Sequence, residues 1–102
     1  MSRVGLLVEF SVSKADAPAL HAALAKERDA VAAGEPGCVL FEVLLWNEAG
    51  TEGAILELYE DQSAREAHRA TPWLAEIKRV LVGLDVTLAR REGPALAAAA
   101  AD

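Results

Sequence analysis

One histidine at an inward position of a predicted helix is the residue of this sequence best suited to move a proton. Residues 62–70 read as a short helix, and His68 shares its apolar stripe with Ala64 and Ala67 at helical spacing. An imidazole changes charge near neutral pH, so His68 is a candidate general base or orienting group in a pocket. A structural histidine satisfied by its neighbours is the alternative that stays open. The charged residues of this helix are expected to point elsewhere: Arg65, Glu66 and Arg69.

Three further residues are candidates for a pocket or for the core. Glu57 and Tyr59 share one face of a predicted strand with Ile55. A carboxylate on such a face must be paired or solvated, so Glu57 is either a pocket base or a member of an interface ion pair. Tyr59 and Trp73 would line an aromatic cavity or belong to the plain core, since large aromatic side chains dominate small cores.

The remaining reactive residue types predict little chemistry. Cys38 lies on a predicted strand, where a buried and inert thiol is expected, and His21 is expected at the surface or edge of a helix. One cysteine and two distant histidines do not make a usual ligand set, so no metal is expected. The chain has no glycine-rich phosphate loop, and nucleotide cofactors are therefore unsupported.

Alternating and helical hydrophobic patterns predict the elements that must position these residues. Asp16, Asp61 and Thr71 precede the three helical runs as capping residues, and residues 92–94 are expected to stop the last strand. The expected strands cover residues 4–12, 38–46, 54–60 and 84–91, and the expected helices cover residues 17–33, 62–70 and 73–82.

The first helix is expected to bury one apolar stripe and to solvate its charged residues. The predicted inward residues are Ala17, Leu20, Leu24 and Val31. The predicted solvated residues are Lys26, Glu27 and Asp29.

The element order of strand, helix, strand, strand, helix, strand predicts an α+β fold of the ferredoxin-like, split βαβ kind. Its four-stranded antiparallel sheet would carry the helices on one face. The second strand, residues 38–46, is apolar on both faces, so the uncovered face of the sheet needs a partner. A second copy of the chain is expected there, giving a homodimer with a barrel-like centre and Trp46 at its seam. The domain would span residues 1–92, followed by a flexible alanine-rich tail at 93–102.

Size and charge limit the possible partners. The chain has 102 residues, 53% of them hydrophobic, and a formal net charge of −6, which fits one globular domain without a basic footprint for nucleic acid. No apolar run reaches the ~20 residues of a membrane-spanning helix, and no targeting segment is recognisable. A soluble, cytoplasmic protein without nucleic-acid or membrane partners is therefore expected.

Three segments together resemble the antibiotic biosynthesis monooxygenase domain family. They are EPGC at residues 35–38, ELYED at 57–61 and EAHRATP at 66–72, and the likeness covers roughly residues 4–90. The resemblance implies a dimeric α+β barrel with a pocket between helices and sheet in each subunit. It also implies a monooxygenase that adds oxygen to a quinol or a hydroxylated aromatic without metal or flavin, so that no cofactor is expected.

The resemblance gives the candidate residues their roles. His68 would be the catalytic group that accepts a proton or orients the substrate, and Tyr59, Trp73, Glu57 and Val8 would contact a small aromatic substrate that reacts with molecular oxygen. Haem-degrading relatives carry an Asn, a Trp and an iron-binding His at positions that read Val8, His68 and Lys78 here, which disfavours haem degradation. Quinol-oxidising relatives often carry His-Phe after Thr-Pro, where this chain has Trp-Leu.

Two other functions fit the same barrel. The first is a small-molecule-binding or stress-related dimer that uses the pocket without turnover. The second is an isomerase of a small lactone or carbonyl compound, in which His68 or Glu57 moves a proton between carbons.

Overall fold

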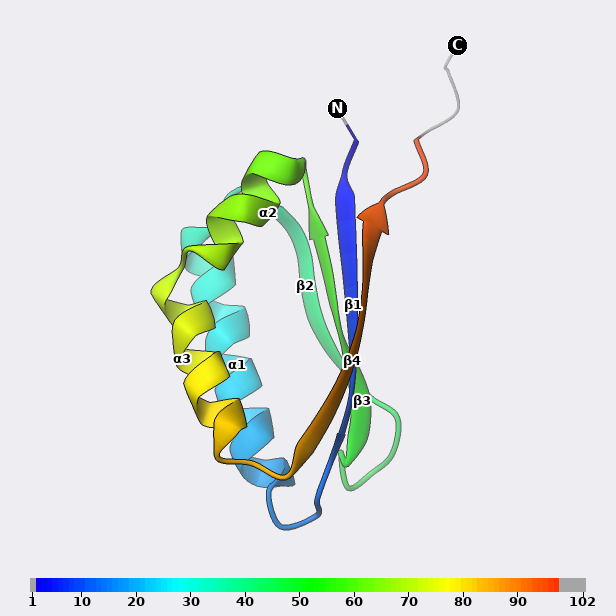
Figure 1. Ribbon diagram of the computed structural model, residues 1–102, viewed down its shortest axis with the longest axis vertical. Helices are drawn as coiled ribbons and strands as arrows, with labels where there is room; N and C mark the ends of the chain where they lie inside the picture. The colour runs from blue at the N-terminus through cyan, green and yellow to red at the C-terminus, as the bar shows by residue number, and fades with distance from the viewer. Residues whose placement is uncertain (1, 98–102) are drawn as a thin grey trace.

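A sheet and a layer of helices on one of its faces make up the structure, a computed structural model that describes residues 2–97 (Figure 1). Within these residues the sheet has four strands in the order β2-β3-β1-β4, with every neighbouring pair antiparallel. This is the predicted ferredoxin-like α+β arrangement. The strands are β1 (Val4–Val12), β2 (Cys38–Leu45), β3 (Glu52–Tyr59) and β4 (Val86–Pro94), and the helices are α1 (Ala17–Gly34), α2 (Gln62–Arg69) and α3 (Pro72–Val82).

The core lies between the two layers and follows the predicted alternation. Phe10 and Val12 of β1 are buried together with Leu20 and Leu24 of α1 and with Ile77 of α3. Each of these side chains removes apolar surface from water, which is the main favourable term in folding. A cavity lies between the same two layers.

A close approach of backbone and ring requires a glycine in β3. Gly53 pairs with Phe10, and a Cβ atom at residue 53 would lie 2.7 Å from the Phe10 ring and 2.1 Å from the Leu44 carbonyl oxygen. Any side chain there would push β2 and β3 apart. The glycine therefore leaves room for the Phe10 ring beside the backbone of β3.

The capping predictions are confirmed for two of the three helices. Asp61 Oδ1 accepts from the backbone N–H of Ala64 at 2.8 Å, and Thr71 Oγ1 accepts from that of Leu74 at 3.3 Å. Pro72, which has no N–H to leave unpaired, starts α3 one residue earlier than predicted. The side chain of Asp16 does not cap α1.

Asp16 instead joins two distant parts of the chain. Its Oδ2 accepts from the backbone N–H of Asp85 at 2.7 Å, so it ties the start of α1 to the turn that precedes β4. The helix start is satisfied without it, because its first residue Ala17 bonds to the carbonyl of Ser13 at 3.0 Å.

The end of the last strand was predicted wrongly. β4 does not stop at Arg91 but continues through Gly93, which pairs with Gly5, and Pro94, which pairs with Val4. A proline is tolerated there because β4 is an edge strand and residue 94 is its last member. Residues 93 and 94 therefore belong to the sheet, and the part of the predicted tail at 98–102 lies outside the described residues.

The sheet face opposite the helices is largely apolar. By the strand register, Leu7 of β1, Leu40 and Leu44 of β2, and Leu56 and Leu58 of β3 share this face. Trp46 follows β2 and is 57% exposed. Among residues 2–97, no helix combines the length and the apolar character needed to cross a membrane.

Candidate active site

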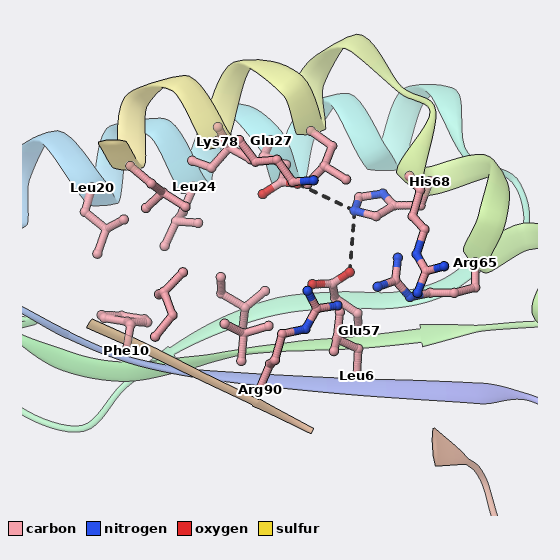
Figure 2. Close-up of a pocket in the computed structure, with 17 residues that line it drawn as sticks. Leu6, Phe10, Leu20, Leu24, Glu27, Glu57, Arg65, His68, Lys78 and Arg90 are labelled. Atoms are coloured by element: carbon pink, nitrogen blue, oxygen red, sulfur yellow. Dashed lines mark ion pairs between the residues drawn. The ribbon is translucent and has the colours of Figure 1, made fainter. Parts of the chain in front are cut away.

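A cavity of about 400 Å³ lies between the helical layer and the sheet, and is called the central cavity here (Figure 2). Its volume falls in the range of small-molecule pockets, about 300 to 1,000 Å³. Apolar side chains from both layers form most of its wall, including Val8, Phe10, Leu24, Ile55, Leu74 and Ile77. Charged residues complete the wall: Glu27, Glu57, Arg65, His68, Arg69, Lys78 and Arg90.

His68 of α2 is 1% exposed and lines the central cavity. Its Nδ1 lies 2.9 and 3.0 Å from the two carboxylate oxygens of Glu35. Its Nε2 lies 3.7 Å from Glu27 Oε2 and 3.6 Å from Glu57 Oε1, as the dashed lines in Figure 2 show. A carboxylate only accepts hydrogen bonds, so Nδ1 carries the hydrogen and Nε2 of the neutral ring keeps its lone pair. When the ring is neutral, Nε2 is therefore the nitrogen that can accept a proton.

Glu35 connects the three helices and orients the imidazole. It follows the last residue of α1, and its Oε2 accepts from the indole N–H of Trp73 at 2.6 Å. The indole itself packs on the end of α1, where a Cβ atom at Gly34 would lie 2.7 Å from the ring. Glu35 therefore joins α1, α2 and α3 at one point. The only signal for Glu35 in the sequence is its place directly before Pro36-Gly37, where the chain leaves α1 for β2.

The expectation that Glu27 is solvated is wrong. It is 5% exposed, and it shares the buried stripe of Leu20, Leu24 and Val31 at spacings of one and two helical turns. Burial, together with the neighbouring carboxylates of Glu57 and Glu35, raises its pKa to about 8. Glu27 is therefore mainly protonated at neutral pH and can act as an acid beside His68 Nε2.

Glu57 and Tyr59 lie next to each other on the inner face of β3. The Tyr59 O–H donates to Glu57 Oε1. Burial raises the pKa of Glu57, while the hydrogen bond from Tyr59 and, when it is protonated, the ring of His68 oppose this shift. Burial and the adjacent Glu57 also raise the pKa of Tyr59, which stays a donor.

The structure separates the five residues proposed from the sequence into two groups. Val8, Glu57 and His68 line the central cavity. Tyr59 and Trp73 are not among the lining residues; they lie behind it and donate to Glu57 and to Glu35. Direct contact of any of the five with a substrate stays a prediction.

A second expectation is also wrong, because the side chain of Arg65 does not point away from the core. It is 3% exposed and donates to Glu92 from Nε at 3.0 Å and from a terminal nitrogen at 3.2 Å. Its guanidinium also lies 5.7 Å from the centroid of the Tyr59 ring. The extension of β4 to Pro94 brings Glu92 under α2, and this buries a face of α2 that would otherwise be solvated. Ala67, which was expected on the inner stripe, is exposed instead.

Two other polar residues lie outside the central cavity. His21 Nε2 lies 2.8 Å from the carbonyl oxygen of Gly50, next to the hairpin between β2 and β3. Burial raises the pKa of the Cys38 thiol to about 11, so it stays protonated and unreactive. Within residues 2–97, no group of three or more His, Cys, Asp or Glu side chains is arranged to hold a metal ion.

Removing the ionisable group of Glu27 should change how stability depends on pH. Folded Glu27 keeps its proton up to about pH 8, whereas an unfolded glutamate releases it near 4.5. The folded state then binds more protons, so this group's contribution to stability is present below pH 4.5 and is lost as pH rises toward 8. The melting temperature of Glu27→Gln should lie close to that of the wild type at pH 5 and exceed it by about 10 °C or more at pH 9.

Scanning calorimetry at several pH values checks this expectation. The matched control is Glu48→Gln, in the exposed hairpin loop. Parallel curves of melting temperature against pH for wild type and Glu27→Gln would contradict the assignment of a bound proton to Glu27.

Comparisons with known proteins agree with this fold. The family model described as antibiotic biosynthesis monooxygenase matches residues 3–79. No match is found among proteins of curated function.

Solved structures with the same fold are numerous, and three illustrate the likeness. A proposed antibiotic biosynthesis monooxygenase from Deinococcus radiodurans has 26% sequence identity and a TM-score of 0.83, covering 94% of this chain and 95% of that one. Another from Caulobacter crescentus has 18% identity and a TM-score of 0.85, covering 94% and 92%. The protein Rv0793 from Mycobacterium tuberculosis has 22% identity and a TM-score of 0.83, covering 97% and 100%. The last two likenesses, at such low identity, concern the fold alone.

Proposed function

The chain belongs to the antibiotic biosynthesis monooxygenase family, and from this we propose that it oxidises a quinol or a related hydroxylated aromatic with molecular oxygen, without metal or flavin. One observation carries the proposal. His68 presents Nε2 to an apolar cavity of about 400 Å³ while Glu35 holds its Nδ1. A base at the wall of an apolar chamber is what such a substrate needs in order to ionise.

The reaction begins with proton transfer to His68. Nε2 takes the proton of a ring hydroxyl, and the carboxylate of Glu35 stabilises the imidazolium that results. The phenolate passes an electron to oxygen, and the radical pair forms a carbon–oxygen bond. Cleavage of the O–O bond releases water, and a further oxygen atom remains on the ring. For 1,4-dihydroxynaphthalene the balance is one quinol and one O2 giving 2-hydroxy-1,4-naphthoquinone and one water.

The cavity supports this chemistry in two ways. Its apolar wall accommodates a planar ring and excludes water, which protects a radical pair from side reactions. Glu27, with its pKa raised to about 8, lies 3.7 Å from Nε2 and can return a proton to the departing oxygen. The proposed acid and base are therefore adjacent.

Oxygen uptake with 1,4-dihydroxynaphthalene tests the function. We expect the purified protein, treated with a chelator, to consume oxygen faster than the uncatalysed reaction. With isotopically labelled oxygen gas, the product should carry one labelled atom. An unlabelled naphthoquinone together with hydrogen peroxide would indicate simple oxidation and would overturn the monooxygenase assignment.

Proton transfer between carbon atoms is a second candidate function. It is favoured by Glu27 and Glu57, whose carboxylate oxygens lie 3.7 and 3.6 Å from the same imidazole nitrogen. Such a group can remove a proton from one carbon and deliver it to another. Incorporation of solvent deuterium into a small lactone or ketone, without oxygen uptake, would select this alternative.

We further propose that two copies of the chain pair through the apolar sheet face. Leu56 lies on β3, in the middle of this face, and is 36% exposed, so a monomer would leave it in water together with the neighbouring leucines as one apolar patch. Wild type should be a dimer in light scattering at micromolar concentration. Leu56→Glu should be a monomer, because a buried and unpaired charge opposes association.

The matched control is Val82→Glu. Val82 is 89% exposed at the end of α3, in the helical layer, so this variant should stay dimeric. A monomeric wild-type protein, or equal association of both variants, would contradict the pairing.

A further inference from the structure

Basic side chains are concentrated around the central cavity of an acidic protein. The chain has 10 basic and 16 acidic residues. Among the described residues, 2–97, the cavity wall nevertheless carries four cations, Arg65, Arg69, Lys78 and Arg90, and only the two carboxyl groups of Glu27 and Glu57. The charge of the pocket is thus opposite in sign to that of the molecule as a whole. A pocket for a neutral aromatic ring would not need this excess.

The cations are incompletely neutralised by the protein. Arg65, Arg69 and Arg90 all approach the single carboxylate of Glu92, at 3.0, 3.7 and 3.5 Å. Arg65 takes both of its oxygens, and Arg69 has a second contact with Glu66 at 3.4 Å. Lys78 forms no ion pair with any residue in the range 2–97 that the structure describes.

The two carboxyl groups inside the cavity do not supply the missing negative charge. The Glu27 carboxyl is mainly protonated at neutral pH, since its pKa is raised to about 8. The Glu57 carboxyl accepts the Tyr59 hydroxyl and lies 3.6 Å from His68 Nε2. Neither forms an ion pair with Lys78 or Arg90 among the described residues.

Lys78 and Arg90 mark the opening of the cavity. Both line it, and both are exposed; the side chain of Arg90 is 59% exposed. Figure 2 shows Lys78 coming from the helical layer and Arg90 from the sheet layer, so the two cations face the cavity from opposite walls. A charged ligand group would stay partly hydrated at this opening, which avoids the penalty of burying an ion.

We propose that the substrate is an aromatic ring that carries an anionic group, a carboxylate or one of similar charge, which binds between Lys78 and Arg90. The ring fills the apolar cavity, and this inference rests on the proposed function for the position of the ring hydroxyl at His68. A planar carboxylate suits the fork of a guanidinium, and an ammonium on the other side adds a second charge. Lys78 and Arg90 then select the substrate without taking part in the chemistry.

Binding without turnover tests the inference. Under anaerobic conditions, titration calorimetry should show 1,4-dihydroxy-2-naphthoate binding about tenfold more tightly than its uncharged methyl ester. The preference should weaken as ionic strength rises, because exposed charges are screened by salt. Equal affinities, tighter binding of the ester, or no binding of either compound at millimolar concentration would overturn the proposal.

Three variants test whether Lys78 and Arg90 cause the tighter binding of the carboxylate. In Lys78→Gln and Arg90→Gln the ratio of the two affinities should fall toward one. Arg79→Gln removes a cation from the neighbouring position of α3 that does not line the cavity, and it should keep the wild-type ratio. An unchanged ratio in both pocket variants would also overturn the proposal. Because no oxygen is present, failure here is distinct from failure of the monooxygenase assignment, which the oxygen-uptake assay measures.

Discussion

Replacing His68 by glutamine should lower the rate of oxygen uptake with 1,4-dihydroxynaphthalene by about 100-fold or more. Nε2 of this buried ring is the proposed base that faces the central cavity, and the amide of glutamine cannot accept the proton of a hydroxyl at neutral pH. Glutamine keeps a polar side chain of similar length, so the hydrogen bond to Glu35 need not be lost completely. Steady-state oxygen consumption, corrected for the uncatalysed reaction, is the measurement.

His21→Gln is the matched control for this prediction. His21 bonds to the Gly50 carbonyl at 2.8 Å and does not line the central cavity. It should keep the wild-type rate. Circular dichroism of both variants separates loss of the base from loss of the fold. Equal rates for a folded His68→Gln and the wild type would remove His68 from the reaction.

Glu35→Gln should lower kcat by about 10- to 1,000-fold and leave KM nearly unchanged. The carboxylate accepts from Nδ1 at 2.9 Å, which keeps Nε2 free to accept a proton and stabilises the imidazolium. A glutamine amide can offer its own hydrogen to Nδ1, and the ring then carries its hydrogen on Nε2 and is no longer a base. Glu35 is thus a positioning residue, because it acts through His68.

Two further variants distinguish positioning from simple structural support. Glu35→Asp keeps the charge and should recover part of the lost kcat. Trp73→Phe removes the indole N–H that donates to Glu35 at 2.6 Å but leaves the imidazole contact in place, so it should cost about tenfold or less. If Glu35→Gln raised KM and left kcat intact, the residue would act on binding and the assigned role would be wrong.

Much of the fold follows from local patterns in the sequence. The alternation of β1 and the capping residues of α2 and α3 are local signals, and each appears in the structure where it was expected. The end of β4 was missed because Gly93-Pro94 is typical of a stop, whereas the pairing partner that extends the strand is the distant β1. Long-range pairing is the information that local patterns lack.

The site was only partly predictable for the same reason. His68 was identified from its helical stripe, and it lines the cavity. Glu27 lies on the buried stripe of α1 with Leu24, but a carboxylate at such a position is usually solvated unless a partner lies opposite. That partner, the imidazole on α2, is supplied by tertiary structure. Arg65 is buried for a similar reason, since Glu92 reaches it only through the extension of β4.

The most direct measurement is a crystal structure of the wild-type protein with 1,4-dihydroxynaphthalene bound under anaerobic conditions. The ring should lie in the central cavity against Val8 and Ile55, with one hydroxyl oxygen about 2.6–3.2 Å from His68 Nε2. A ring bound elsewhere, or one whose hydroxyl groups both point away from the imidazole, would contradict proton transfer to His68 as the first step.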